Sequence, residues 1–367
     1  MLYREAGQFK TTYATDMAIF PIRQDRIAIF ALLAFAFVGL PAMAALKIWP
    51  FGSEYLLRAI LLPFLILSLA AIGVNILIGY CGQISLGSGA FMAIGAYMAY
   101  KFGTGMPEIG LPPLPVLFAI LLGGFSAAFV GILFGLPSLR IKGLYLSVAT
   151  LASQFFFDWL FLRVKWFTNY APSGSVSAPE LIFFGWTVNT PIEKYLLALM
   201  FVTVFALLAK NLVRGSIGRQ WMAIRDMDIA AELMGIRPLY AKLSAFAVSS
   251  FIIGVAGALW AFVYLGSWEP LAFSIDRSLQ LLFMVIIGGL GSILGCFLGA
   301  AFILIMPIML NIIPGALGIP ISTETITHLE FIIFGSLICY LLIKEPHGFA
   351  RLWVIGKEKL RTWPFPY

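Results

Sequence analysis

Uncharged polar side chains interrupt one of the most apolar stretches of the sequence. From Asn75 the chain reads NILIGYCGQISLGSGAFMAIGAYMAY, in which Gln83 and Ser85 stand among five closely spaced glycines. Amides and hydroxyls can hydrogen-bond a small polar solute, and in lipid an irregular backbone is tolerated only when it is buried in protein or lines a water-filled cavity. We therefore expect Asn75, Gln83 and Ser85 to line a translocation pathway at a broken helix. The alternative is close helix packing by small residues.

A second polar cluster lies in GLYLSVATLASQFFFDW, residues 143–159. Ser147, Thr150 and Gln154 are spaced i, i+3 and i+7, so they would share one face of a helix. Hydroxyl groups on one helix face inside an apolar run suit the same solute-binding chemistry. Ser147 and Thr150 are therefore added to the predicted pathway wall.

A third cluster consists of glycine alone. The stretch IIGGLGSILGCFLGAAF contains a double G-x-x-x-G at Gly291, Gly295 and Gly299. Small residues at this spacing let two helices in a membrane approach closely. Here the sequence predicts tight packing and no functional site.

No group of residues in the sequence is suited to catalysis. His328 and His347 are the only histidines, which leaves no Ser/His/Asp arrangement, and neither a phosphate-binding loop nor a metal-spaced cluster occurs. Cys81, Cys296 and Cys339 lie in or beside apolar runs and are interpreted as small core residues. The sequence predicts a chain that is not an enzyme and has no catalytic residue, metal or cofactor. Because no ionisable relay lies deep in the spans, its energy must come from elsewhere.

The elements that position these residues are membrane helices. Hydrophobic residues make up 61% of the 367 residues and charged residues 11%, against about 25% charge in soluble domains. The sequence therefore predicts an all-α polytopic membrane protein of about ten transmembrane helices, eight or nine being the alternative. The runs 86–101, 195–209 and 278–290 are short for a span and predict half-helices, re-entrant pieces or tilted spans extended at their ends. The apolar runs lie at about 27–46, 56–79, 86–101, 114–135, 144–163, 195–209, 243–264, 278–290, 293–313 and 327–344.

The net charge of +7 is interpreted as a topology signal and not as nucleic-acid binding. With the N-terminus inside, the inner segments hold 17 Lys and Arg residues and the outer segments hold 6. Both termini are therefore expected in the cytoplasm. The predicted organisation is a cytoplasmic arm (1–26), a transmembrane domain (27–344) and a cytoplasmic tail (345–367). The longest outer loop, 163–194, is expected to form an aromatic belt at the lipid interface or a docking surface for an external partner.

The longest charged passage is the inner loop 210–242, with six basic and three acidic residues. Its residue types predict a short helix in which Asp226 is the N-cap, Asp228 adds negative charge to the first turn, and Gly235 ends the helix. An apolar stripe of Ile224, Met227, Ala231 and Met234 would run along one side. Such a helix would lie on lipid headgroups or dock into a partner.

Four stretches taken together, in this order, resemble the permease subunits of bacterial branched-chain amino acid ABC importers, of the LivM type. They cover about residues 75–303 and are NILIGYCGQISLGSGAFMAIGAYMA, GLYLSVATLA, GRQWMAIRDMDIAAELMGIRPLYAKLSAFAVSSFIIGVAGALWA and IIGGLGSILGCFLGAAFI. The resemblance implies an inner-membrane protein that pairs with a homologous second permease subunit and two cytoplasmic ATPase subunits. A periplasmic binding protein would deliver leucine, isoleucine or valine. Urea or short amides are alternative substrates, and a stand-alone channel or secondary carrier is a more distant alternative.

The resemblance also assigns the inner loop a role. Coupling loops of importers often have the pattern E-A-A-x-x-x-G, and here Ala230, Ala231 and Gly235 keep the spacing while Ile229 stands in place of the glutamate. The charge at that place would then come from a neighbouring acidic residue. The residues expected to couple to the ATPase are Arg225, Asp226, Asp228, Ala230, Ala231, Glu232 and Gly235.

Overall fold

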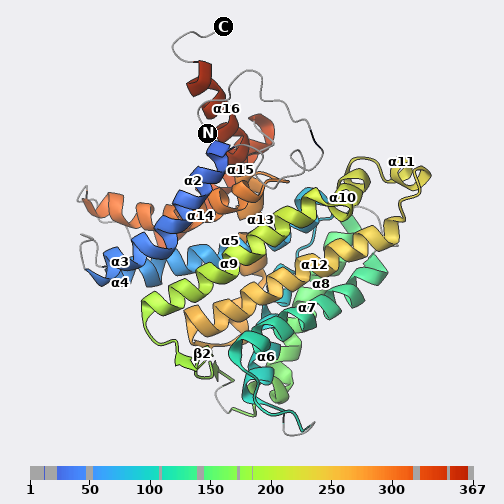
Figure 1. Cartoon of the computed structure of the whole chain (residues 1–367). Coiled ribbons are helices and arrows are strands. Elements are labelled where there is room, and N and C mark those ends of the chain that lie inside the picture. The colour runs from blue at the N-terminus through green and yellow to red at the C-terminus, as the bar shows by residue number, and fades with distance from the viewer. Residues whose placement is uncertain are drawn as a thin grey trace.

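The computed structural model describes residue 12 and residues 23–46, 53–106, 110–138, 144–171, 174–183, 185–316, 323–344 and 348–362. Most of the predicted N-terminal arm, part of the C-terminal tail and the inner segment at 139–143 lie outside these residues. The chain is a bundle of helices (Figure 1). This confirms the predicted all-α polytopic fold.

Each of the ten predicted apolar runs coincides with a helical segment, and some segments consist of more than one helix. The α-helices of the described residues are α2 (Arg23–Ala34), α3 (Leu40–Ala45), α4 (Ser53–Tyr55), α5 (Leu62–Asn75), α6 (Ser88–Thr104), α7 (Val116–Ser138), α8 (Leu144–Arg163), α9 (Pro191–Arg214), α10 (Ser216–Asp226), α11 (Asp228–Leu233), α12 (Pro238–Leu259), α13 (Ile275–Gly288), α14 (Ile293–Ala316), α15 (Thr323–Lys344) and α16 (Gly348–Thr362). Wider π-helical turns continue several of them, namely η1 (Phe35–Gly39), η2 (Leu56–Leu61), η3 (Ile76–Tyr80) and η6 (Trp260–Leu265).

Within the described residues, seven helices are long and apolar enough to cross a membrane, fewer than the ten expected. Two of the three short runs are extended at their ends and become full spans, Pro191–Arg214 and Pro270–Gly288. The run 86–101 stays short, because α6 has only 17 residues. In α15 the stretch Phe331–Leu341 is apolar. Two of the three short runs are therefore the spans extended at their ends that the sequence allowed, and α6 is the one that stays short.

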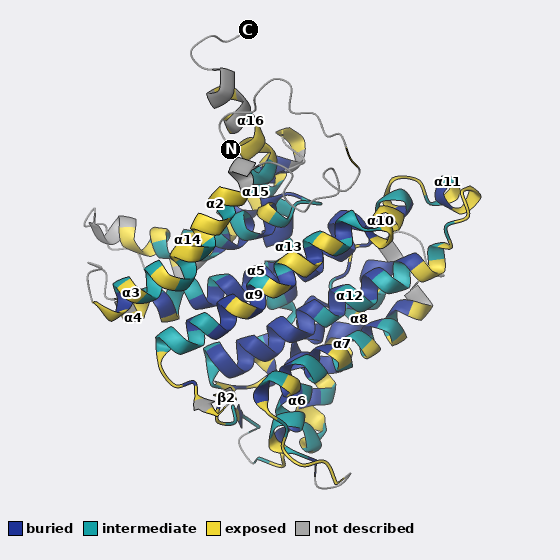
Figure 2. Ribbon diagram, in the orientation of Figure 1, coloured by how far each residue is buried: buried dark blue, intermediate teal, exposed yellow. Residues whose placement is uncertain are grey.

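Two spans form the centre of the bundle. In the segments Leu56–Tyr80 and Pro238–Leu265, 83% of the most apolar window is buried, against 11% in Arg26–Ala45. Figure 2 shows this difference as dark blue along α5 and α12 and yellow along α2. Since a helix that is apolar on every side is covered either by protein or by lipid, the peripheral spans must meet lipid or another membrane subunit.

Glycines allow the central helices to touch backbone to backbone. A Cβ on Gly95 of α6 would lie 2.0 Å from the Gly254 carbonyl oxygen of α12. A Cβ on Gly299 of α14 would lie 1.9 Å from the Met284 oxygen of α13. Tight packing is thus confirmed for Gly295 and Gly299 of the double G-x-x-x-G. The third glycine, Gly291, instead has φ of +75° in the turn between α13 and α14.

The predicted outer loop 163–194 matches the interval between α8 and α9. It contains the 3₁₀ turn η5 (Lys165–Thr168) and the short strands β1 (Val176–Ser177), β2 (Ile182–Phe183) and β3 (Trp186–Thr187). β2 pairs with β3, while β1 pairs antiparallel with β4 (Ser267–Trp268), just before the 3₁₀ turn η7 (Pro270–Phe273). The loop is therefore tied to the start of the segment that leads into α13.

Candidate functional site

The polar cluster predicted from the sequence surrounds a break in the helix path. η3 ends at Tyr80, residues 81–87 form an irregular segment, and α6 begins at Ser88. Gly82 turns the chain with φ of +72°, and its amide donates to the Ile78 oxygen at 3.1 Å. The Gln83 amide donates to the Leu77 oxygen at 3.0 Å. We call residues 81–87 the break segment.

The hydroxyl face of α8 supports the break segment. The Leu86 amide donates to Oγ1 of Thr150 at 3.0 Å, and the Ser147 hydroxyl donates to the Ile84 oxygen at 3.3 Å. Within the segment, the Gly87 amide donates to Oγ of Ser85 at 3.4 Å. A buried backbone without these partners would be strongly destabilising in lipid. Ser147 and Thr150 therefore stabilise the broken chain, and whether they also face a solute stays a prediction.

Gln154 and Ser278 hold the first turn of α6. The Ala90 amide donates to Oε1 of Gln154 at 2.6 Å, and the Gly89 amide donates to Oγ of Ser278 at 2.7 Å. The Gln154 amide group donates to the Phe273 oxygen at 2.9 Å. These bonds satisfy two helix-end donors that have no partner within the helix. Gln154 could have been selected from its spacing to Thr150, whereas nothing in the sequence marks Ser278.

Asn75 joins α5 to the turn between α13 and α14. Its side chain is buried, its Nδ2 donates to the Ser292 oxygen at 3.2 Å, and its Oδ1 accepts from the Gly291 amide at 2.9 Å. Both hydrogen-bonding atoms of the amide are thus used between helices. This arrangement favours a structural role for Asn75, and its predicted place on a pathway wall stays untested.

Gln83 and Ser85 are both buried in the break segment. Oε1 of Gln83 has no hydrogen-bond partner among the described residues. Ser85 lines a small cavity of about 10 Å³ together with Ser88 and Ser249. That space suffices for about one water molecule. The cavity beside Ser85 is therefore too small for an amino acid in this structure.

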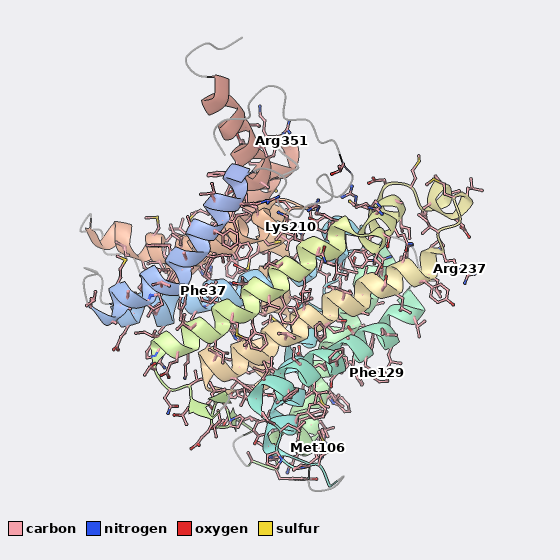
Figure 3. All side chains as sticks on the ribbon, in the orientation of Figure 1. Phe37, Met106, Phe129, Lys210, Arg237 and Arg351 are labelled. Carbon is pink, nitrogen blue, oxygen red and sulfur yellow. The ribbon has the colours of Figure 1, made fainter. Side chains whose placement is uncertain are left out.

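The loop predicted to contact an ATPase folds as two short helices, α10 and α11, and projects from one end of the bundle (Figure 1). Arg237 lies at the end of α12 that follows α11, and Met106 lies far from these helices (Figure 3). The prediction that Asp226 is an N-cap is wrong. Asp226 is the last residue of α10, and extended Met227 precedes α11 with no side-chain cap. The predicted first-turn position of Asp228 is confirmed.

The end of the predicted helix is correct in detail. Gly235 has φ of +86°, and its amide donates to the Glu232 oxygen at 2.9 Å while the Ile236 amide donates to the Ala231 oxygen at 3.0 Å. This pair of bonds is the Schellman arrangement, which needs a left-handed residue at that place. The motif explains why a glycine three residues after Glu232 ends α11.

The predicted apolar stripe does not form one face. Ile224 and Ala231 are buried, whereas Met227 and Met234 are 70% and 72% exposed. The reason is the extended residue between the two helices, which breaks the helical spacing. The exposed apolar side chains around α11 are instead Met227, Ile229, Leu233, Met234 and Tyr240, which we call the α11 patch. Among the predicted coupling residues, Asp226, Glu232 and Gly235 are exposed, Asp228 and Ala230 are partly exposed, and Ala231 is buried.

Arg225 points back into the bundle. Its Nη1 donates to the Gly79 carbonyl oxygen at 2.8 Å, and its Nε donates to Asp226 at 2.9 Å. A Cβ on Gly82 would lie 2.8 Å from Cγ of Arg225, so the glycine leaves room for the arginine. Arg225, Gly79, Asn75 and Gly291 therefore link the loop to the centre of the bundle.

Comparison with known proteins identifies what kind of membrane protein carries this arrangement. The family described as "Branched-chain amino acid transport system / permease component" matches residues 56–340, which include the break segment, the α10–α11 loop and the α13–α14 turn. The chain belongs to this family. The resemblance found in the sequence is thereby confirmed, and the chain is a membrane permease component.

Several permease proteins are similar in sequence to this chain. The high-affinity branched-chain amino acid transport system permease protein LivM of Escherichia coli (strain K12) is 27% identical over 82% of this chain and 71% of its own length. A probable LivM of Methanocaldococcus jannaschii is 25% identical over 66% of this chain and 69% of its own length. The ribose import permease protein RbsC of Haemophilus influenzae is 25% identical over 67% of this chain and 74% of its own length. No solved structure matches the chain significantly.

Proposed function

We propose that this chain is one permease subunit of an ATP-driven importer that carries branched-chain amino acids across the bacterial inner membrane. The match to LivM over most of the chain is the observation that supports it best. The proposal includes a homologous second permease subunit, two ATPase subunits and a periplasmic binding protein. It also places both termini and the α10–α11 loop in the cytoplasm, in agreement with the distribution of basic residues.

The α11 patch is the proposed ATPase contact. Leu233 and Ile229 are 86% and 68% exposed on a helix that projects from the bundle. Apolar side chains gathered on an exposed surface favour burial against a partner. The flanking acids Asp226, Asp228 and Glu232 would form the polar rim of that contact. Here Ile229 would supply apolar area where other importer loops carry a glutamate.

The break segment is the proposed moving part of the pathway. Side chains of α8 hold its backbone, and Arg225 from the α10–α11 loop bonds to Gly79 in η3 just before it, so a shift of that loop would reach the segment through η3. Gln83, Ser85, Ser147 and Thr150 would then offer their polar groups to the solute once the segment opens. Asn75 would contribute by fixing the position of η3.

Reconstitution tests the proposed function. The complete complex in proteoliposomes, with its binding protein outside, is expected to accumulate leucine only when ATP is present on the ATPase side. An excess of isoleucine should reduce the uptake, while urea and ribose should not. Uptake by the isolated chain without ATP or partners would instead establish a channel or secondary carrier. Preferential uptake of urea or ribose would show that this compound, and not a branched-chain amino acid, is the substrate.

A double substitution tests the docking surface. Leu233→Ser with Met234→Ser should leave the permease folded, because both side chains are exposed, but should reduce co-purification of the ATPase subunits at least tenfold. Ile217→Ser provides the control, since Ile217 is an exposed apolar residue on α10. Full retention of the ATPase by the double variant would reject the α11 patch as the contact.

A further inference from the structure

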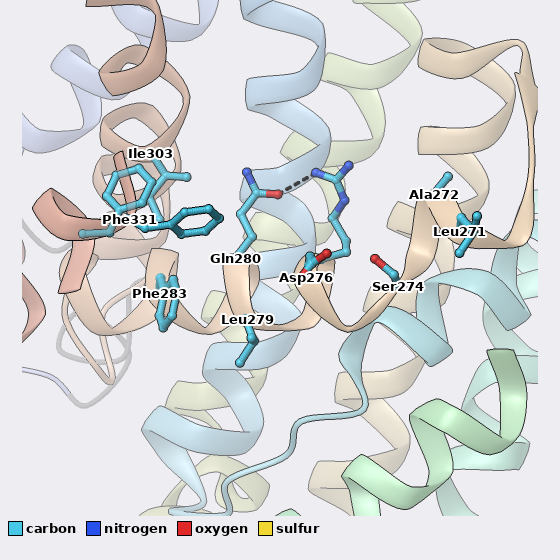
Figure 4. Close-up of a pocket in the computed structure, with 11 residues that line it drawn as sticks. Leu271, Ala272, Ser274, Asp276, Leu279, Gln280, Phe283, Ile303 and Phe331 are labelled. Atoms are coloured by element: carbon cyan, nitrogen blue, oxygen red, sulfur yellow. Dashed lines mark hydrogen bonds between the residues drawn. The ribbon is translucent and has the colours of Figure 1, made fainter. Parts of the chain in front are cut away.

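A pocket of about 290 Å³ lies at the first turn of α13, and none of the site residues predicted from the sequence lines it (Figure 4). Its volume is at the lower edge of small-molecule sites, roughly 300–1,000 Å³, and so suits a ligand of few atoms. One side is polar and the other is apolar. The lining residues are Leu271, Ala272, Ser274, Asp276, Arg277, Leu279, Gln280, Phe283, Ile303, Phe331 and Phe334.

Arg277 supplies a cation whose hydrogen-bond donors are only partly satisfied by the described residues. Its Nη1 donates to Oε1 of Gln280 at 2.6 Å, the bond dashed in Figure 4, and its guanidinium lies 4.6 Å from the centre of the Trp260 ring. Its Nε is buried and has no hydrogen-bond partner among the described residues. Ring stacking and the Gln280 bond fix the direction of a planar group suited to a carboxylate.

The same turn supplies a negative charge beside this cation. Asp276 lines the pocket, is exposed, and lies in the first turn of α13. Ser274 occupies the N-cap position but makes no side-chain cap bond. A helix N-terminus attracts an anion, while a carboxylate next to it attracts an ammonium group. The polar side therefore presents opposite charges at neighbouring positions.

The apolar side is formed by helices α13, α14 and α15. Phe283, Ile303 and Phe334 come from these three helices in turn, and Ile303 and Phe334 are buried. Phe331 and Leu271, by contrast, are 66% and 70% exposed at the margin. In Figure 4, Phe331, Phe283 and Ile303 gather on one side, with Ser274 and Asp276 on the other. A branched aliphatic group would gain burial there.

We propose that this pocket binds the zwitterion of an apolar α-amino acid during transport. The carboxylate would bind Arg277, the ammonium group would bind Asp276, and the branched side chain would lie against Phe283, Ile303 and Phe334. This inference rests on the proposed function and names the site at which its substrate is held. An ethanolamine lipid headgroup has the same pair of charges, so the test separates the two sources.

The position of α13 supports a role in transport. Its 14 residues span roughly 20 Å, with the pocket at the first turn. Beyond its last turn, the Gly291 amide bonds to Asn75, and a Cβ on Gly291 would lie 3.6 Å from Nη1 of Arg225. A ligand that shifts the first turn would therefore act through α13 on the residues that connect to the α10–α11 loop.

The proposal is tested by measuring how tightly leucine binds to the complete complex. The complex is placed in nanodiscs of phosphatidylcholine and phosphatidylglycerol without binding protein, and radiolabelled leucine is titrated. Leucinamide, which lacks the carboxylate, and 4-methylpentanoate, which lacks the amino group, serve as competitors. The wild-type complex should prefer leucine to each by about tenfold or more, as expected for charge-assisted hydrogen bonds.

Each substitution should remove one of these preferences. Arg277→Gln should weaken leucine binding about tenfold and make leucine and leucinamide equivalent, while Arg277→Lys retains part of the preference. Asp276→Asn should abolish the preference for leucine over 4-methylpentanoate. Arg163→Gln is the matched control, because Arg163 is exposed at the end of α8 outside the pocket.

Three results would overturn the inference. These are wild-type binding without either preference, preferences that survive in Arg277→Gln and Asp276→Asn, and displacement of leucine when phosphatidylethanolamine is added to the nanodiscs. If ATP-driven leucine uptake persists in such a case, the proposed function stands and the site lies elsewhere. If wild-type uptake of leucine itself is absent, the proposed function fails.

Discussion

The guanidinium of Arg225 donates a hydrogen bond of 2.8 Å to the carbonyl oxygen of Gly79, although 146 residues separate them in the chain. The bond connects α10, in the exposed loop, with η3, directly before the break segment. The Gly79 oxygen lies in a π-helical turn, where a side chain can reach a backbone group. One side chain thus ties the α10–α11 loop to the broken helix.

Arg225→Gln is expected to uncouple ATP hydrolysis from transport. Loss of a charge-assisted bond to a partly buried carbonyl should lower the free energy of unfolding by about 1–3 kcal/mol. In proteoliposomes, leucine uptake per ATP hydrolysed should fall several-fold, because the loop can then move without η3. The measurement compares both rates in the same preparation.

Arg219→Gln is the control for this variant. It changes an exposed arginine of α10 that bonds to the Arg214 oxygen at the junction of α9 and α10. Arg219→Gln should not alter the uptake per ATP, and an unchanged ratio in Arg225→Gln would contradict a linking role.

Asn75→Leu is expected to destabilise the contact between α5 and the α13–α14 turn. The substitution leaves the Gly291 amide and the Ser292 oxygen without their bonds, at about 1–3 kcal/mol for each buried group. Thermal unfolding of the purified complex should therefore occur at a clearly lower temperature. Ser126→Ala on α7, whose hydroxyl bonds only within its own helix, serves as the control. Equal midpoints for the two variants would show that the bridge is unimportant.

Gly95→Ala is expected to push α6 away from α12. The added Cβ would lie 2.0 Å from the Gly254 oxygen, so the helices must separate, at about 1–3 kcal/mol for overpacking. Gly335→Ala in α15 is a matched control, since nothing lies within 4 Å of its added Cβ. That variant should be neutral or more stable by up to about 1 kcal/mol, because alanine favours the helix. Thermal unfolding of the purified complex measures both effects. Similar unfolding midpoints for Gly95→Ala and Gly335→Ala would mean that the α6–α12 contact is loose.

Gln154→Leu is expected to destabilise the start of α6 and thereby to abolish transport. The amide accepts from Ala90 and Ser278 and donates to Phe273, so an isosteric apolar group leaves several buried groups without partners. Ser153→Ala is the control, because its hydroxyl bonds only to Thr150 of the same helix. Protease protection of α6 in the assembled complex would measure the effect. An unchanged cleavage pattern would show that Gln154 does not hold α6.

The sequence by itself determined the class of protein and the main parts of the site. Hydropathy located all ten helical segments, because an apolar run in a membrane protein has almost no alternative to a helix. Glycine and polar residues marked the break before α6, since regular helices in lipid rarely combine them. Gly235 predicted the end of α11 because its left-handed conformation is a local backbone property.

Only the tertiary structure decided which partners these residues have. Asn75 bonds to residues more than 200 positions away, and Arg225 turns inward to Gly79, pairings that helical spacing does not predict. Asp226 ends one helix instead of starting the next, because Met227 takes an extended conformation between them. The pocket beside Arg277 exists only where α13, α14 and α15 meet. Local propensity specifies an element, whereas a site depends on contacts between elements distant in the chain.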